Sequence, residues 1–128
     1  EMIGCLVGSE MCIRDSSHFT NNDDVTASLK VIENDFNSWA CVTDGSNGVY
    51  FLEEGTLCNL PAPDIKAKDT LGAGDVWHGA FAVCLAEGKS ESEAIKFSNL
   101  AAAIKCTKFG GQSSIPTRTE INEFINSK

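Results

Sequence analysis

The spacing of apolar residues predicts one helix and three strands in the first half of the chain. Val25, Leu29 and Ile32 recur at helical intervals, and the polar residues 21–24 before them can cap a helix that ends within residues 34–38. Short apolar runs separated by glycine-containing turns follow, as expected for strands buried in a sheet. The predicted strands cover residues 39–43, 49–52 and 56–60.

The pattern becomes helical after the segment Pro61-Ala62-Pro63. Ser90 and Glu93 form a capping box before one helix, and Thr117 and Glu120 form another before a short helix near the C-terminus. The predicted helices cover residues 75–87 and 90–106, with the short third helix after Thr117. One helix, three strands and three helices in this order fit part of a larger α/β sheet.

Composition and charge narrow the class of protein. The 128 residues suit a single domain, and 42% of them are hydrophobic, which is enough for a core. A net charge of −8, from 10 Lys and Arg against 18 Asp and Glu, argues against a nucleic-acid partner. No apolar run approaches the ~18 residues that span a membrane, and the N-terminus does not have the pattern of a secretory signal. The six cysteines form no Cys-x-x-Cys pair, which favours free thiols in the cytoplasm over disulfides or a metal site.

The start of the chain differs in character from the rest. Residues 6–16, Leu-Val-Gly-Ser-Glu-Met-Cys-Ile-Arg-Asp-Ser, resemble the in-frame translation of a transposase-type sequencing-library adapter. On that interpretation residues 1–16 are a non-native segment, and residues 17–128 are a piece of a longer protein. The alternative is an ordinary strand and loop, because Met2 to Val7 is apolar and Gly8-Ser9 can turn.

The segment Asp69-Thr70-Leu71-Gly72-Ala73-Gly74-Asp75 is the best candidate for a chemical site. Its two glycines let the backbone bend just before a helix, so that the amides at the helix start point into open space. Such a helix start binds anions, and phosphoryl transfer depends mostly on positioning and charge stabilisation. Asp75 in the first turn can accept a proton from an attacking hydroxyl. A plain loop with an N-capping aspartate is the alternative, and the spacing alone leaves both open.

The same segment is similar to the second signature of the ribokinase-like carbohydrate kinases, the PfkB family. Further segments resemble that family in the same order, so that the similarity runs from Trp39 to Phe124. They are the strand and turn 42–48, Pro61-Ala62-Pro63, the Asn-Ala helix 97–103 and the closing loop 110–116. The resemblance implies an α/β chain that forms the C-terminal part of a ribokinase-like three-layer α/β/α fold. It also implies a cytoplasmic enzyme that phosphorylates a sugar with ATP.

The resemblance implies a role for each matching residue. Asp75 would be the general base for the sugar hydroxyl, and the amides of Gly72, Ala73 and Gly74 would form the anion hole for the γ-phosphate. The implied nucleotide-binding residues are Thr43, Asp44, Gly45, Ser46, Asn47, Gly48, Gly74, Asp75 and Asn99. A monovalent cation, K⁺, is implied beside the anion hole. Its ligands would be Asp69, the carbonyls of Leu71, Lys105, Lys108 and Gly110, and Ser114.

Several of these residues also have a plainer interpretation. Asn99 can be a surface residue of its helix, and Lys105 and Lys108 can simply complement the negative end of a helix dipole. Trp77 and His78 flank the predicted anion hole, where a packed or half-exposed side chain is the simpler expectation for each.

The sequence departs from the family because segments of its N-terminal half do not appear here. These are the first glycine-rich signature, the β lid over the sugar and the Asn-x-x-Glu motif tied to Mg²⁺, so Mg²⁺ is implied for the parent enzyme only. The sugar cannot be named, although residues 105–111 favour a fructose-like one. The parent is expected to bind a sugar and ATP, to need neither nucleic acid nor membrane, and to form a homodimer.

Two hypotheses follow for the chain itself. The parent is an active sugar kinase and this piece is inactive and poorly stable, because its sheet exposes an unpaired edge. Alternatively, the piece is a nucleotide-binding module without catalysis, either by truncation or as a pseudoenzyme.

Overall fold

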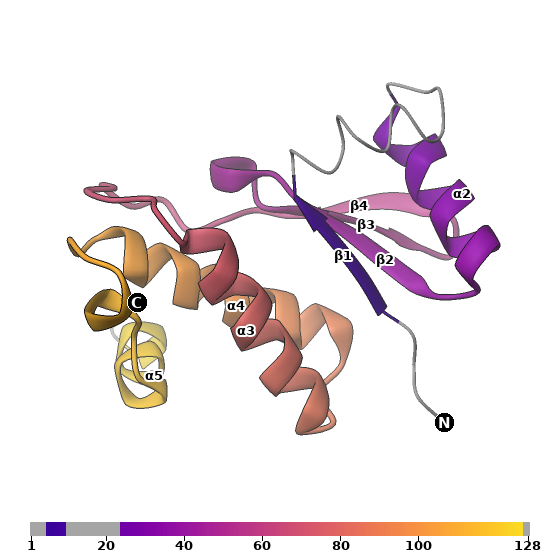
Figure 1. The fold of residues 1–128 in the computed structure, drawn as a ribbon. Coiled ribbons are helices and arrows are strands. Elements are labelled where there is room, and N and C mark those ends of the chain that lie inside the picture. The colour runs from indigo at the N-terminus through magenta and orange to yellow at the C-terminus, as the bar shows by residue number, and fades with distance from the viewer. Residues whose placement is uncertain (1–4, 10–23, 127–128) are drawn as a thin grey trace. The chain divides into compact units, whose positions relative to one another are not determined.

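The computed structural model describes residues 5–9 and 24–126, and for residues 5–9 it describes the backbone alone. These residues fall into two compact units, residues 1–61 and residues 62–128. Figure 1 labels the helices and strands of each unit.

In the residues that the structure describes, the first unit is a four-stranded sheet with helix α2 (Val25–Phe36) packed on it. The strands are β1 (Cys5–Ser9), β2 (Trp39–Thr43), β3 (Val49–Glu53) and β4 (Thr56–Leu60). They lie in the order β1-β2-β3-β4, with β1 parallel to β2 and the later neighbours antiparallel. Helix α2 contacts β2 and β3, as Figure 1 shows.

The predicted helix and strands of this unit are confirmed. Leu29 of α2 is completely buried against apolar residues of β2 and β3, since the helical spacing of the apolar residues turns one face of α2 toward the sheet. Asp24 caps α2, and its carboxylate accepts a hydrogen bond of 2.9 Å from the amide of Thr26. The helix ends where Asn37 adopts a left-handed conformation with φ of 48°.

Strand β1 lies in the segment that resembles an adapter sequence. Its backbone pairs with β2 so that Val7 stands opposite Cys41. Residues 5–7 thus lie in a strand, as the alternative interpretation expected, but Gly8 and Ser9 continue that strand rather than forming a turn. Strand pairing uses backbone groups that every such segment carries, so it does not bear on the origin of residues 1–16. Residues 10–16 lie outside the described residues.

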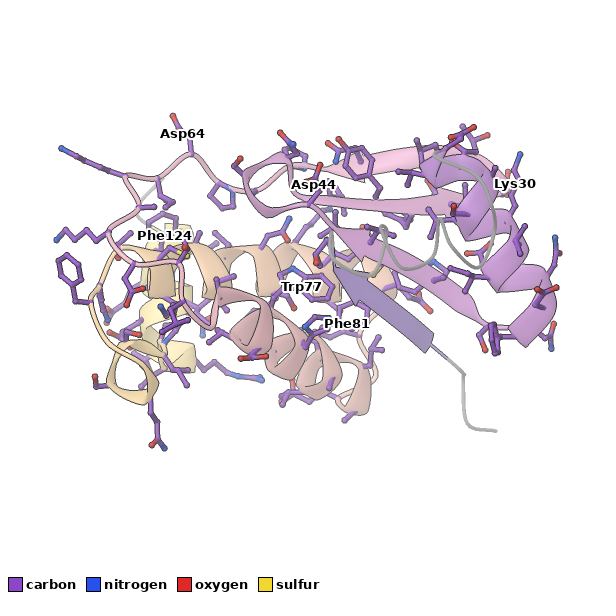
Figure 2. The ribbon with its side chains drawn as sticks, turned by 45° about the horizontal axis from the view of Figure 1, so that its top comes forward. Lys30, Asp44, Asp64, Trp77, Phe81 and Phe124 are labelled. Carbon is purple, nitrogen blue, oxygen red and sulfur yellow. The ribbon has the colours of Figure 1, made fainter. Side chains whose placement is uncertain are left out.

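The second unit contains three helices packed around a shared apolar core. They are α3 (Ala73–Ala86), α4 (Glu91–Cys106) and α5 (Arg118–Asn126), with a short 3₁₀ turn at Gln112–Ser114. Helix α4 contacts both α3 and α5, and its Ala101 and Ile104 meet the buried Ile121 of α5. On α3, Trp77 and Phe81 stack with ring centroids 4.9 Å apart (Figure 2).

Both predicted capping boxes are present. The carboxylate of Glu93 accepts a hydrogen bond from the backbone amide of Ser90. In return, the hydroxyl of Ser90 accepts a hydrogen bond from the backbone amide of Glu93. Thr117 and Glu120 exchange the same pair of hydrogen bonds before α5. These local bonds satisfy amides that a helix start otherwise leaves open.

Helix α3 begins at Ala73 rather than at the predicted Asp75. Gly72 takes a left-handed φ of 73°, and its carbonyl accepts a hydrogen bond of 3.1 Å from the backbone amide of Val76. The glycine thus turns the chain into the helix before the aspartate is reached, which places Asp75 within the first turn.

The described cysteines are free thiols. Cys41, Cys84 and Cys106 are buried, and Cys58 is partly exposed. Burial raises the pKa of the Cys84 and Cys106 thiols. Within the described residues no helix is both long and apolar enough to cross a membrane.

The turn at Gly72 leads to a stability prediction. An added Cβ would meet no atom closer than the Asp75 Oδ2 at 3.9 Å, so Gly72→Ala should cost only the conformational penalty of a left-handed residue, about 1–2 kcal/mol. Gly74→Ala is the matched control, since Gly74 is helical and open around its Cα. It should be neutral or stabilising by up to about 1 kcal/mol. Urea unfolding followed by circular dichroism measures both, and equal effects of the two variants would contradict the account.

A second prediction concerns pH. The Lys108 ammonium, 2.6 Å from Glu120, and two hydrogen bonds from Thr117 lower the pKa of the Glu120 carboxyl to about 2 from 4.5. Because the folded-state value is the lower one, the ionised carboxylate stabilises the fold above pH 4.5, and this contribution is lost as pH falls toward 2. Glu120→Gln keeps the capping oxygen but should remove this part of the pH dependence.

Thermal unfolding between pH 6 and about 2 tests this expectation. The wild-type midpoint should fall more steeply through the window than that of Glu120→Gln. Glu123→Gln, an exposed change on the same helix, should follow the wild type. Parallel curves for wild type and Glu120→Gln would refute the assignment.

Candidate functional site

Asp69 holds the loop that leads into α3. Its carboxylate accepts the amide of Leu71 through Oδ1 at 3.0 Å and the amide of Gly110 through Oδ2 at 3.1 Å. The amides of Lys68 and Asp69 both donate to the carbonyl of Cys106 at the end of α4. The loop is therefore fastened to two segments that lie far from it in the sequence.

The hydrogen bonds from Leu71 and Gly110 also set the charge state of Asp69. They are the largest causes that lower the pKa of its carboxyl, and the nearby Lys105 lowers it further. Hydrogen bonds to the charged form favour that form. Asp69 is therefore a fixed negative charge next to the glycine-containing turn.

The start of α3 presents backbone amides and a carboxylate side by side. The amide of Ala73 donates to the carbonyl of Thr70 at 3.1 Å, so it is already engaged. In the described part of the chain, the amides of Gly72 and Gly74 donate no hydrogen bond to another residue. Asp75 is exposed in the same turn. Two of the three predicted anion-hole amides are thus open, and both precede the predicted base by one to three residues.

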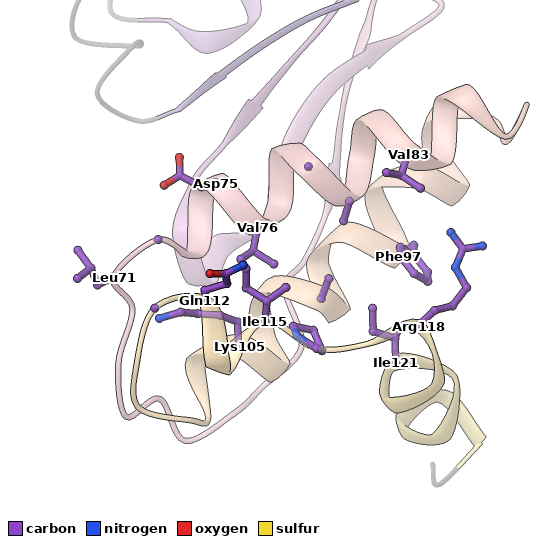
Figure 3. Close-up of a pocket in the computed structure, with 16 residues that line it drawn as sticks. Leu71, Asp75, Val76, Val83, Phe97, Lys105, Gln112, Ile115, Arg118 and Ile121 are labelled. Atoms are coloured by element: carbon purple, nitrogen blue, oxygen red, sulfur yellow. The ribbon is translucent and has the colours of Figure 1, made fainter.

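A pocket of about 520 Å³ lies beside this turn. It is lined mainly by apolar side chains of α3, α4 and α5, including Phe97 and Ile121, and its rim includes Gly72 and Asp75. Figure 3 shows the Asp75 carboxylate at the start of α3, turned away from Val76 and Phe97. The carboxylate therefore stands at the edge of the pocket rather than among its apolar side chains.

Lys105 is the buried charge of the site. Its side chain is 1% exposed, and its Nζ lies 3.1 Å from the Asp69 carbonyl and 3.6 Å from the Asp69 Oδ2. Lys108, by contrast, forms an exposed ion pair with Glu120. Lys105 does lie in the last turn of α4, where a cation complements the helix dipole, but its side chain is also buried against Asp69.

Hydrogen bonds connect some of the predicted cation ligands, namely Asp69, Gly110 and Ser114. Gly110 is bonded to Asp69, and the buried Ser114 hydroxyl donates to the carbonyls of Gly110 and Gly111. The carbonyl of Lys105 accepts the amide of Lys108. The oxygen set thus suits a monovalent cation in chemistry, but the positive group beside the carboxylate is the ammonium of Lys105.

Asn99 is buried rather than on the surface. It is 6% exposed, and its Oδ1 accepts a hydrogen bond of 2.7 Å from the Trp77 indole. His78 is half-buried, and its Nδ1 lies 2.7 Å from the carbonyl of Gly74. Trp77 and His78 are thus packed side chains, as the simpler expectation held, and the Asn99 surface interpretation is wrong.

The predicted nucleotide turn lies in the first unit. Asp44 closes it, because its amide donates to the carbonyl of Gly48 at 2.8 Å and its carboxylate accepts the Asn47 side chain at 2.9 Å. Gly45 and Gly48 take positive φ values of 47° and 92°, which favour glycine at both places. Thr43 ends β2 and Ser46 is exposed within the turn. The other candidate residues belong to the second unit.

The sequence interpretation did not foresee two contacts of the site. One is the ion pair of Lys105 with Asp69, and the other is the hydrogen bond of Trp77 with Asn99. A signal for the first was present, since Lys105 follows Phe97 and Ala101 at four-residue steps on one helix face. A lysine on such an apolar face is expected to need a buried partner.

Comparison with known proteins agrees with the predicted resemblance. Residues 9–118 match the pfkB family carbohydrate kinases. The ribokinase of Bacillus subtilis (strain 168) is 39% identical over 85 residues, which cover 66% of this chain and 29% of that protein. The ribokinase of Haemophilus influenzae is 45% identical over 84 residues, covering 66% and 28%.

Solved structures show the same relationship. Ribokinase from Thermotoga maritima superposes with a TM-score of 0.85 at 36% identity, over 95% of this chain and 42% of that one. A ribokinase of Agrobacterium tumefaciens, described as putative, gives 0.83 at 34% identity, over 96% and 40%. The chain spans less than a third of the length of the curated ribokinases it matches, and its mixed helices and strands form part of a ribokinase-like α/β fold. The chain belongs to the pfkB family of carbohydrate kinases.

Proposed function

We propose that the chain is the phosphoryl-transfer part of an enzyme that phosphorylates a sugar with ATP. One observation carries the proposal. The exposed Asp75 and the open amides of Gly72 and Gly74 share the first turn of α3, at the rim of a pocket. Membership of the carbohydrate kinase family supports this reading.

Asp75 would act as the general base. Its carboxylate accepts the proton of the sugar hydroxyl as the hydroxyl oxygen attacks the γ-phosphorus, and the bond from that phosphorus to the bridging oxygen of ADP breaks. The oxygen that takes the phosphoryl group thus loses its proton to the enzyme, and ADP leaves with the electron pair of the broken bond.

The start of α3 would stabilise the phosphoryl group in transit. The amides of Gly72 and Gly74 and the positive end of the helix dipole face the charge on its oxygens. The amide of Ala73 can join them if it exchanges the Thr70 carbonyl for a phosphate oxygen. A preformed set of donors is effective because it needs no reorganisation during the reaction.

Each unit has its own proposed nucleotide contacts. In the first unit they are Thr43, Asp44, Gly45, Ser46, Asn47 and Gly48 of the closed turn. In the second unit they are Gly74, Asp75 and Asn99. Mg²⁺ would accompany the phosphates. The described residues include no group of three or more His, Cys, Asp or Glu side chains that could hold a metal ion, and we assign none of them to it.

We expect the sugar that receives the phosphoryl group to be a pentose. The relatives with the highest identities quoted above are ribokinases, whereas the sequence around residues 105–111 favoured a fructose-like sugar. A probable fructokinase of Arabidopsis thaliana is 34% identical over 114 residues, so fructose is the second sugar to test.

A second function concerns this chain by itself. Because it spans 29% and 28% of the two ribokinases, we propose that residues 17–128 bind nucleotide without catalysis when the rest of the parent is absent. Sugar phosphorylation by the purified chain would refute this. Residues 1–16 are proposed to be non-native, and an uninterrupted natural gene that encodes Leu6 to Ser16 would overturn that part.

The general base is tested in the full-length parent enzyme. Asp75→Asn should lower turnover by about 10²–10⁴-fold, the usual contribution of a positioned base. It should leave ATP affinity nearly unchanged, because asparagine keeps the size of the side chain and one hydrogen-bonding oxygen. Steady-state kinetics with ribose and fructose and ATP titration by calorimetry measure the two effects. Asp64→Asn, an exposed change outside the site, is the control. Near-normal turnover of Asp75→Asn would refute the assigned base.

A further inference from the structure

Trp77 and Asn99 form a polar contact in the interior of the second unit. The two side chains are 4% and 6% exposed, and the indole Nε1–H of Trp77 donates a hydrogen bond of 2.7 Å to the Oδ1 of Asn99. Trp77 belongs to α3 and Asn99 to α4, 22 residues further along the chain. The bond therefore joins the helix that carries Asp75 to the helix that carries a predicted nucleotide-binding residue.

The chemistry of this bond fixes the orientation of the Asn99 carboxamide. An indole N–H can only donate, whereas a carboxamide has an oxygen that accepts and a nitrogen that donates. The atom of Asn99 that faces Trp77 must be the oxygen, because the nitrogen would place two donors against each other. The Nδ2 donors of Asn99 are therefore directed away from the indole.

The indole itself has little freedom to move. Its ring stacks on the ring of Phe81, with centroids 4.9 Å apart and an angle of 14° between the planes (Figure 2). The ring of His78 meets the indole edge-on, with centroids 5.5 Å apart. A donor whose ring is held by two others keeps its direction, so it can hold the group that accepts from it.

Packing alone does not require a polar pair at this place. Ile95 and Ala103 lie four residues before and after Asn99 on the same face of α4, and both are buried apolar residues. When both partners of a buried hydrogen bond are replaced by apolar groups of the same shape, stability changes little. The polar pair therefore points to a use of the Asn99 carboxamide beyond core packing.

Trp77 lies apart from the groups that are proposed to react. Asp75 is exposed and Trp77 is buried, although they are two residues apart on α3. Side chains at this spacing do not face each other on a helix. Any effect of the indole on the site must therefore pass through Asn99.

We propose that Trp77 is a positioning residue for the nucleotide: its indole N–H holds the Asn99 carboxamide in the orientation that contacts the bound nucleotide. The inference rests on the proposed function, in which Asn99 is a nucleotide contact. Because Asn99 is ordered before the nucleotide arrives, less side-chain freedom is lost on binding. Loss of the indole donor therefore weakens nucleotide binding more than it slows the chemical step.

Trp77→Phe in the full-length parent tests the inference. Phenylalanine keeps an aromatic ring next to Phe81 but has no N–H. The KM for ATP should rise roughly 3–10-fold, the range expected for one net hydrogen bond, while kcat and the KM for the sugar change little. A KM for ATP that stays at the wild-type value, or a loss confined to kcat, would overturn the inference.

Trp39→Phe is the matched control. It makes the same chemical change in the first unit, where the centroids of the Trp39 and Phe51 rings lie 5.9 Å apart. This variant should keep the wild-type KM for ATP. A rise equal to that of Trp77→Phe would mean that the effect does not pass through Asn99, which contradicts the inference.

A spectroscopic measurement needs no variant at residue 77. The 128-residue chain has two tryptophans, so its NMR spectrum contains two indole N–H signals, and Trp39→Phe identifies the signal of Trp77. This signal should exchange slowly with water and should shift when ATP is added, because Asn99 contacts both the indole and the nucleotide. An indole proton that exchanges as fast as in an unfolded chain, or a signal that ATP leaves in place, would refute the role of Trp77.

The two readouts separate this inference from the kinase function. Sugar phosphorylation with an unchanged KM for ATP in Trp77→Phe would refute the role of Trp77 alone. If the parent binds ATP but phosphorylates no sugar, the kinase function fails. ATP affinity measured by calorimetry for the wild type and for Trp77→Phe then decides the role of Trp77: a loss of roughly 3–10-fold supports it, and equal affinities overturn it.

Discussion

The candidate site depends on the hydrogen bonds and the ion pair that Asp69 forms with neighbouring segments. Through one carboxylate and one carbonyl it contacts the amides of Leu71 and Gly110 and the ammonium of Lys105. Without these contacts the loop before α3 would be joined to the helices mainly by the bonds from residues 68 and 69 to the carbonyl of Cys106. A loop held on several sides can keep its backbone amides in one direction, which is what electrostatic stabilisation of a transferring group requires.

The turn at Gly72 converts this fixed loop into a site. A left-handed residue ahead of α3 directs the chain into the helix and leaves open amides next to Asp75. The helix start supplies the positive end of a dipole, and under the proposed function the carboxylate of Asp75 would supply the base. The two proposed functions, anion binding and proton removal, would thus arise from a single turn of backbone. Asp75 is one of the residues that line the pocket beside that turn.

Local features of the sequence predicted most of the elements. The strands 39–43 and 56–60 and both capping boxes agree with the structure, because apolar spacing and caps act over a few residues. The predicted start of α3 was two residues late, because the true start depends on the φ value that Gly72 adopts. The partner of Lys105 lies 36 residues away, and no local pattern encodes a contact of that range.

The roles of the predicted site residues stay predictions, but the structure shows contacts among some of these residues. The family resemblance identified Asp69, Gly110 and Ser114 as a group, and the structure brings them together. It did not indicate that Asn99 is buried against Trp77 or that an ammonium stands beside Asp69. Both depend on which face of α4 is buried, a property of the packed unit rather than of a motif.

The most direct test is a crystal structure of the full-length parent with ADP, a sugar and aluminium fluoride, which mimics the phosphoryl group in transit. The account predicts fluoride atoms within about 3 Å of the amides of Gly72 and Gly74, with the acceptor hydroxyl hydrogen-bonded to Asp75. A fluoride complex bound away from this turn, or a sugar hydroxyl that does not reach Asp75, would contradict it.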